Sequence, residues 1–196
     1  MNLTQLPDRV VEMDAVKRIL HSDYGRGLPA LVFVHAFGCN RSDWDAQVAH
    51  FSPLNRCISV DLGGHGLTPG RSDHAKVEIH GADVVALMRE LDLGPSIVVG
   101  NSLGCRVAME ISARAPNLTE ALILVDGSQL SPMGENVHAA LGAGTKPKEF
   151  PALARKMFST MFSPGFDFDK VSEMTERATR VPPQLAVDLL ADIGRL

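Results

Sequence analysis

Four short apolar runs restrict the fold of this chain more than any other feature. Each run is continuous rather than alternating and is rich in Val, Ile and Leu, and together they are residues 30–34, 57–60, 96–99 and 121–125. Strands that are buried on both faces have this composition, as in a parallel sheet covered by helices. Helical spacing of apolar residues fills the intervals, over 42–51, over 77–91 and from Leu103 to just before Pro116. The sequence therefore predicts an α/β fold with a mostly parallel sheet and flanking helices.

The pattern changes after Ser128. Residues 131–151 are rich in Gly and Pro, which is typical of a loop or linker. From Ala152 the spacing is helical and rich in Met and Phe, and a second helical stretch ends the chain. We therefore expect a core at residues 1–129, followed by a linker and a helical segment at 130–196. The Met and Phe side chains either belong to the core or also line a pocket.

Composition narrows the class of protein. The net charge is -4 and no basic patch is visible, which argues against nucleic acid or an anionic membrane as a partner. The N-terminus has no signal-peptide pattern and no apolar run is long enough for a membrane span, so we expect a cytoplasmic protein. The spacing of Cys39, Cys57 and Cys105 matches no metal site, so we expect reduced thiols and no metal.

The segment from Gly100 to Gly104 carries the strongest chemical signal. Its sequence Gly-Asn-Ser-Leu-Gly matches G-x-S-x-G, with a predicted strand before it and a predicted helix after it. A tight strand-to-helix turn exposes the Ser102 hydroxyl at a helix N-terminus, where free amides favour developing negative charge. Bulky side chains at the two glycines would clash as the chain doubles back, so Ser102 is predicted to be a nucleophile on a strained backbone.

Two further loops follow predicted strands. The segment VFVHAFG continues past the end of the first apolar run, and its backbone amides could supply the other half of an oxyanion hole. The segment from Asp61 to Gly66 comes after the second run. Because ligands bind at the carboxyl ends of strands in open α/β sheets, we expect Asp61, Ser102, Asp126 and His35 to share one edge.

These motifs, in this order and spacing, resemble the α/β-hydrolase superfamily. LVFVHAFG with Trp44, VDLGGHGLT, VVGNSLG and ALILVDGS carry the resemblance over residues 20–130, and the cofactor-free, capped esterase and C–C hydrolase branch is the most similar. The resemblance implies that Ser102 is the nucleophile and that the backbone N–H groups of Leu103 and Phe37 form the oxyanion hole. It makes His35 a brace for its loop rather than a base. Asp126 occupies a position where some members carry the catalytic acid, although more carry it after the next strand.

Two departures from the pattern bear on activity. His35-Ala36 replaces the usual His-Gly pair, and Ala tolerates a positive φ less well than Gly. The superfamily places its catalytic histidine after the acid, yet His138 is the one histidine that follows Ser102, and it lies in the Gly/Pro-rich segment. We expect His138 to be a solvated loop residue. The resemblance implies that the chain is a C-terminally truncated form, with an incomplete core at 1–129 and the linker and helical cap segment at 130–196.

The resulting expectation is a serine-nucleophile hydrolase that acts on a small, partly apolar ester or related carbonyl substrate and is impaired in this chain. Two alternatives remain open: a catalytically inactive binding protein, and a subunit that another chain completes. In a truncated chain, residues 121–125 would form an apolar edge of the sheet. Self-association through that edge therefore remains open.

Overall fold

The computed structural model describes residues 9–12, 18–127, 144–163 and 165–193. Its strands are β1 (Arg9–Glu12), β2 (Arg18–Tyr24), β3 (Ala30–Val34), β4 (Cys57–Val60), β5 (Ser96–Asn101) and β6 (Thr119–Val125). Its α-helices are α1 (Asp45–Phe51), α2 (Val77–Glu90), α3 (Leu103–Arg114), α5 (Phe150–Thr160), α6 (Phe168–Thr179) and α7 (Pro183–Ile193). Short 3-10 helices are η1 (Arg41–Trp44), η2 (Ser72–Ala75), η3 (Pro116–Leu118) and η5 (Pro147–Glu149). The α/β fold predicted from the apolar runs is confirmed.

All six strands form one sheet in the order β1-β2-β4-β3-β5-β6. The four predicted strands are neighbours and parallel, with β3 paired to both β4 and β5, and β5 paired to β6. The antiparallel strands β1 and β2 extend the sheet beyond β4. The sequence did not predict these two strands, because neither contains a continuous apolar run.

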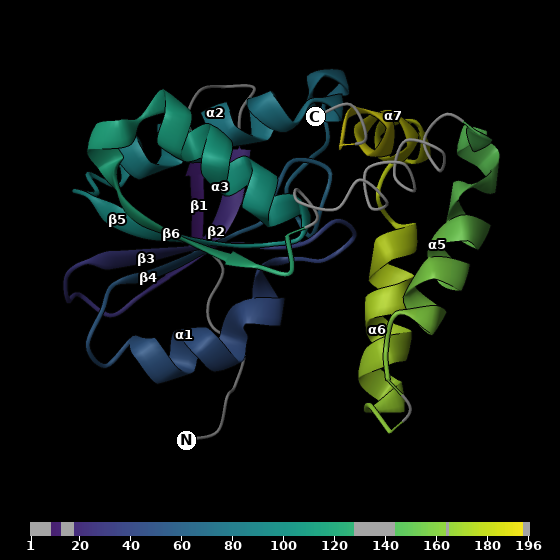
Figure 1. Cartoon of the computed structure of the whole chain (residues 1–196), viewed down its shortest axis with the longest axis horizontal. Helices are drawn as coiled ribbons and strands as arrows, with labels where there is room; N and C mark the ends of the chain where they lie inside the picture. The colour runs from purple at the N-terminus through teal and green to yellow at the C-terminus, as the bar shows by residue number, and fades with distance from the viewer. Residues whose placement is uncertain (1–8, 13–17, 128–143, 164, 194–196) are drawn as a thin grey trace.

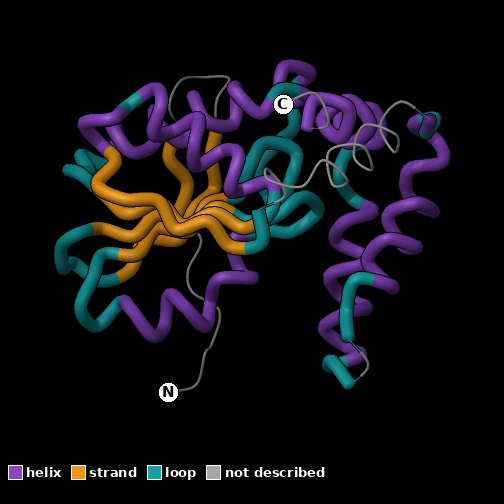
Figure 2. Tube along the Cα trace, in the orientation of Figure 1, coloured by secondary structure: helices purple, strands orange, loops and turns teal. Residues whose placement is uncertain are grey.

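Helices cover both faces of the sheet. α2 and α3 lie on one face and α1 lies on the other (Figures 1 and 2). Val32 and Val98 from the sheet, Met88 from α2 and Val107 from α3 belong to one buried apolar cluster. The predicted helix over 42–51 divides into η1 and α1, and the side chain of Asn40 caps the start of η1.

β6 departs from the prediction that all four runs are buried on both faces. Ile123, Leu124 and Val125 are 49%, 46% and 41% exposed. Among the described residues β6 pairs with β5 alone, so it forms one edge of the sheet. Its outer side therefore has no neighbouring strand within the described chain.

In the part of the chain that the structure describes, the α-helices α5, α6 and α7 follow the sheet and form the cap. α5 and α6 run side by side beyond the end of the sheet, while α7 lies between them and the α2 face (Figure 1). Asp192 on α7 accepts hydrogen bonds from the backbone N–H of Val77 (3.0 Å) and from Lys76 Nζ (2.8 Å), which ties the cap to the start of α2. The sequence predicted helix in this region without resolving α6 as a separate element. The domain boundary after residue 129 stays a prediction. No helix in the described ranges has the length and apolarity to cross a membrane.

Candidate active site

One edge of the sheet gathers the predicted site residues. His35 follows β3, Asp61 follows β4, and Asp126 follows β6, while Ser102 comes directly after β5. Because β3, β4, β5 and β6 are parallel, these four positions lie at the same carboxyl edge. The shared edge predicted from the sequence is therefore present.

Ser102 lies on a strained turn between β5 and α3. Its backbone has φ 51 and ψ -110, in a region that non-glycine residues rarely adopt. The Ser102 N–H donates to the Val125 carbonyl of β6 (3.0 Å), and the Asn101 side chain donates to the same carbonyl (3.1 Å). The strained backbone predicted at Ser102 is thus observed, and β6 fixes it from one side.

Two glycines make this turn sterically feasible. A Cβ atom at Gly100 would lie 2.1 Å from the Gly104 carbonyl oxygen, and one at Gly104 would lie 2.2 Å from the Val34 carbonyl oxygen. Both contacts are to backbone, which cannot move aside without displacing β3 or α3. The spacing of the G-x-S-x-G motif therefore reflects the close approach of α3 to two strands.

Leu103 begins α3 immediately after Ser102 and is buried. The first amides of a helix have no intrahelical acceptor, so the Leu103 N–H is available to a ligand beside Ser102. Phe37 follows the predicted His35-Ala36 pair, and its ring packs edge-on against His65 (5.6 Å between ring centroids) and Phe150 of α5 (6.0 Å). These contacts hold the loop after β3 between the next core loop and the cap.

His35 connects two core loops. Its Nδ1–H donates to the Ala36 carbonyl (2.7 Å), and its Nε2 accepts from the Leu62 N–H (3.0 Å). Burial lowers the pKa of His35 more strongly than nearby Asp61 raises it. A neutral His35 ring with both nitrogens engaged has no free lone pair to act as a general base, and its role as a brace stays a prediction.

Asp61 organises the loop after β4 from a fully buried position. Its carboxylate accepts from the backbone N–H of Arg41 (2.8 Å), from the Arg41 guanidinium, and from the Leu67 N–H (2.9 Å). Asp126, by contrast, is exposed at the end of β6 with φ 51. It makes no hydrogen bond to a histidine among the described residues, and its role as the acid stays a prediction.

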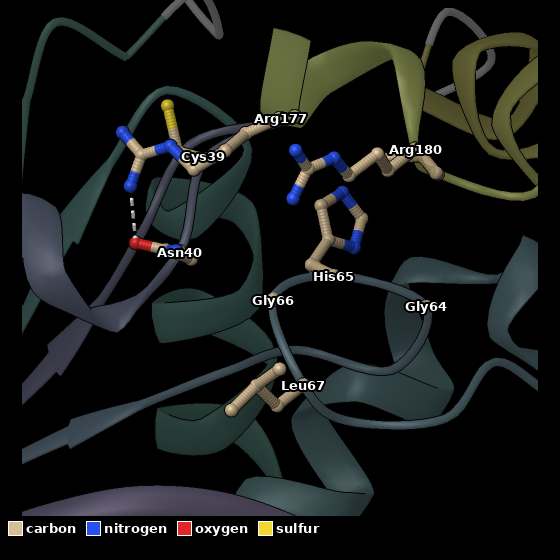
Figure 3. Close-up of a pocket in the computed structure, with 10 residues that line it drawn as sticks. Cys39, Asn40, Gly64, His65, Gly66, Leu67, Arg177 and Arg180 are labelled. Atoms are coloured by element: carbon tan, nitrogen blue, oxygen red, sulfur yellow. Dashed lines mark hydrogen bonds between the residues drawn. The ribbon is translucent and has the colours of Figure 1, made fainter. Parts of the chain in front are cut away.

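Arg177 on α6 joins the cap to the loop that follows β3. Its Nη1 donates to Asn40 Oδ1 (2.6 Å) and Ser42 Oγ (3.1 Å), and its Nη2 pairs with Asp43 Oδ1 (2.5 Å). Figure 3 shows the bond to Asn40. These partners are 134 to 137 residues away in sequence, so no local pattern could have identified Arg177.

Gly38 brings the same loop into direct contact with the cap. A Cβ at Gly38 would lie 2.8 Å from both Ala178 Cβ and Phe158 Cζ, and its φ of +73 is also unfavourable for other residues. The cap therefore packs directly on the segment that the sequence predicts to supply an oxyanion amide.

His138 lies outside the described residues. Within those residues, no group of three His, Cys, Asp or Glu side chains is arranged to hold a metal ion.

Comparison with known proteins agrees with this geometry. Residues 31–195 match the model of the alpha/beta hydrolase family. The chain is 33% identical over 139 residues to Esterase Rv0045c of Mycobacterium tuberculosis (66% of this chain, 45% of that protein). It is 31% identical over 118 residues to the sn-1-specific diacylglycerol lipase ABHD11 of Mus musculus (59% of this chain, 37% of that protein). The chain thus spans less than half the length of these two relatives.

A solved structure extends the likeness in fold to nearly the whole chain. A thermophilic esterase from Thermogutta terrifontis, solved with malate bound, superposes with a TM-score of 0.80 at 20% identity, and the match covers 96% of this chain and 72% of that one. The parallel sheet, the serine on its strand-to-helix turn and the match over residues 31–195 lead to one conclusion. The chain belongs to the alpha/beta hydrolase family.

Proposed function

We propose that this chain carries the nucleophile and oxyanion hole of a serine hydrolase that cleaves small, partly apolar esters or related carbonyl compounds. The observation that carries the proposal is the backbone of Ser102, held at φ 51 between a buried strand and the first turn of α3. Strain of this kind at a non-glycine residue is concentrated at functional sites. The names of the two relatives, an esterase and a lipase, support the same reaction class.

In the proposed reaction, Ser102 Oγ attacks the substrate carbonyl and transfers its proton to a base. The amides of Leu103 and Phe37 hydrogen-bond the oxygen that becomes negative. Collapse of this intermediate releases the alcohol and leaves an acyl group on Ser102, and water then removes the acyl group. Asp126 is the candidate acid that would orient the base.

The cap supports a partly apolar substrate. Phe150 and Phe158 from α5 and Val187 from α7 form a buried apolar cluster, against which Phe37 packs. The predicted oxyanion loop is therefore bordered by apolar side chains. Phe37 is only partly buried, so an acyl or alcohol group with hydrocarbon character would gain free energy by covering the exposed part of its ring.

The proposed reaction needs a general base, and the described residues do not identify one. His138 is the one histidine after Ser102 in the sequence, and it lies outside the described residues. Without a base the serine hydroxyl keeps its proton near neutral pH and is a poor nucleophile. We therefore propose that the chain by itself turns over slowly, with the residual rate that binding and an oxyanion hole provide.

Covalent labelling with a fluorophosphonate tests the nucleophile. Intact-mass spectrometry should detect one adduct on the wild-type chain, and free imidazole should accelerate its formation by acting as the base. Ser102→Ala should abolish the adduct, whereas Ser72→Ala, which changes an exposed serine of η2, should leave it unchanged.

The outcomes separate the hydrolase from its alternatives. A wild-type chain that stays unlabelled even with imidazole would contradict the proposal and favour a binding protein that has lost the chemistry. Labelling that persists in Ser102→Ala would assign the nucleophile to another residue. Ester turnover comparable to that of intact esterases would contradict the proposed impairment alone.

A further inference from the structure

A small cavity lies at the junction of the core and the cap. Residues 38–40 after β3, residues 64–67 after β4, and the C-terminal end of α6 enclose about 110 Å³ (Figure 3). In the sheet, β3 stands between β4 and β5. The cavity is therefore on the β4 side of the predicted oxyanion loop, whereas Ser102 is on the β5 side.

Two guanidinium groups line this cavity. Arg177 and Arg180 project from the same end of α6 toward the core loops, with Arg180 over His65 in Figure 3. None of the described residues that line the cavity is acidic. The lining therefore presents two cationic groups and no anionic one.

The two arginines differ in how their charge is compensated. Arg177 is held by Asn40 and Asp43, and its Nε is buried with no hydrogen-bond partner among the described residues. Arg180 is exposed, and none of the ion pairs in the described chain involves it. A buried donor without a partner and a guanidinium without a carboxylate both favour an anionic ligand.

We propose that this cavity binds a small oxyanion, a carboxylate or a phosphate, with Arg180 as its principal charge partner. The guanidinium fork matches the two oxygens of such a group. Arg177 forms a fixed wall because the core loop already holds its Nη atoms. The ligand would contact residues 38–40 on the side away from Ser102, which makes this site distinct from the oxyanion hole. The oxyanion is either the far end of a carboxylate-bearing substrate or a free anion.

Binding measurements test the site without requiring catalysis. Succinate and inorganic phosphate are titrated into the full chain by calorimetry, with uncharged succinamide as the matched control. We expect binding of at least one anion and none of succinamide. Arg180→Gln should weaken the binding by about tenfold, the size expected when a charged hydrogen-bond partner is removed. Arg180→Lys, which keeps the charge and loses the fork, should fall between Arg180→Gln and wild type.

Arg89→Gln provides the control for net charge. Arg89 is exposed on α2, away from the cavity, and its substitution removes the same charge. The Arg89→Gln variant should bind the anion with the same affinity as the wild-type chain. No anion binding by the wild-type chain, or equal weakening by Arg89→Gln and Arg180→Gln, would overturn the proposal.

Fluorophosphonate labelling then distinguishes the two sources of the anion. If saturating succinate protects Ser102 from labelling, the site receives the carboxylate end of a substrate that extends to the nucleophile. If succinate binds without protecting Ser102, the ligand is a free anion. A chain that binds succinate through Arg180 but never reacts at Ser102 would refute the proposed hydrolase and leave the anion site standing.

Discussion

Four buried histidines form a row that begins in the loop after β3, passes through the loop after β4 and through α2, and ends in η2. Ring centroids are 5.2 Å apart for His35 and His65, 6.4 Å for His65 and His80, and 5.2 Å for His80 and His74, the last pair being stacked at 12°. The carboxylate of Asp83 accepts from His74 Nε2 (2.9 Å) at the far end. Asp61 also acts on His35 at the near end, but burial outweighs it and lowers the pKa of His35, His65 and His80, so the row has little capacity to accept further protons.

His80 sets the magnitude of the expected acid sensitivity. Burial, with a further contribution from His74, lowers its pKa from 6.5 to about 3. The unfolded chain therefore takes up a proton that the folded chain refuses, so the free energy of unfolding decreases as the pH falls below the unfolded value. Between about pH 7 and about pH 5 this linkage removes roughly 2 kcal/mol, and the loss continues until the pH reaches the folded value.

Urea unfolding at the two pH values measures this effect. The wild-type chain should lose about 2 kcal/mol more stability on acidification than His80→Phe, which keeps a ring at this position and cannot bind the proton. His50→Gln, at an exposed histidine of α1, should lose as much as the wild type. Comparing the change with pH cancels any cost of the substitution itself.

Equal losses in the wild type and His80→Phe would refute the reasoning. If His80→Phe does not fold, NMR titration of the wild-type rings gives the answer directly. A His80 ring that becomes protonated above about pH 5, within the folded state, would show that burial does not exclude the proton.

Three further substitutions test how the core loops are held. Gly38→Ala should lower the free energy of unfolding, measured with urea, by about 2 kcal/mol, because the added Cβ strains the backbone and contacts the cap. Gly94→Ala is the control and should leave that free energy unchanged, because a Cβ there meets nothing within 4 Å. Arg177→Gln should cost about 2 kcal/mol and slow fluorophosphonate labelling, whereas Arg155→Gln, in an exposed cap ion pair, should cost below about 1 kcal/mol and leave labelling unchanged. Asp61→Asn removes one partner of a buried ion pair and should destabilise the chain by about 3 kcal/mol in the same assay.

The sequence predicted the parts of this molecule that have local signals. The apolar runs of β3, β4 and β5 can be recognised from consecutive residues, because burial requires apolar side chains at those positions. The two glycines of the G-x-S-x-G turn can be recognised in the same way, because steric clearance is needed at their own positions. The strain at Ser102 followed from the same spacing. These features are also the ones that place the candidate nucleophile.

Features that depend on distant residues were missed. β2 carries Arg18, His21 and Asp23, and it is a strand because β1 and β4 pair with it rather than because of its own pattern. In the sequence Arg177 looks like an ordinary polar residue of an amphipathic helix, and its contact with the loop after β3 exists only after the cap has packed. The sequence therefore gave no indication of the cavity that Arg177 and Arg180 line.

The edge strand β6 leads to the last prediction, which concerns association. An apolar edge with unpaired backbone groups recruits other chains, and native proteins commonly protect such edges with charge. Leu124 lies within this edge and is 46% exposed. We expect the chain to associate with a second copy of itself through β6, with a mass in analytical ultracentrifugation that rises with concentration.

Leu124→Lys should shift this equilibrium toward monomer, because a lysine on each copy disfavours pairing. Leu54→Lys, at a site that is 78% exposed after α1, adds the same charge away from the edge and should leave association unchanged. A wild-type chain that remains monomeric at all concentrations would contradict this prediction, and equal dissociation by both variants would assign the effect to net charge rather than to β6.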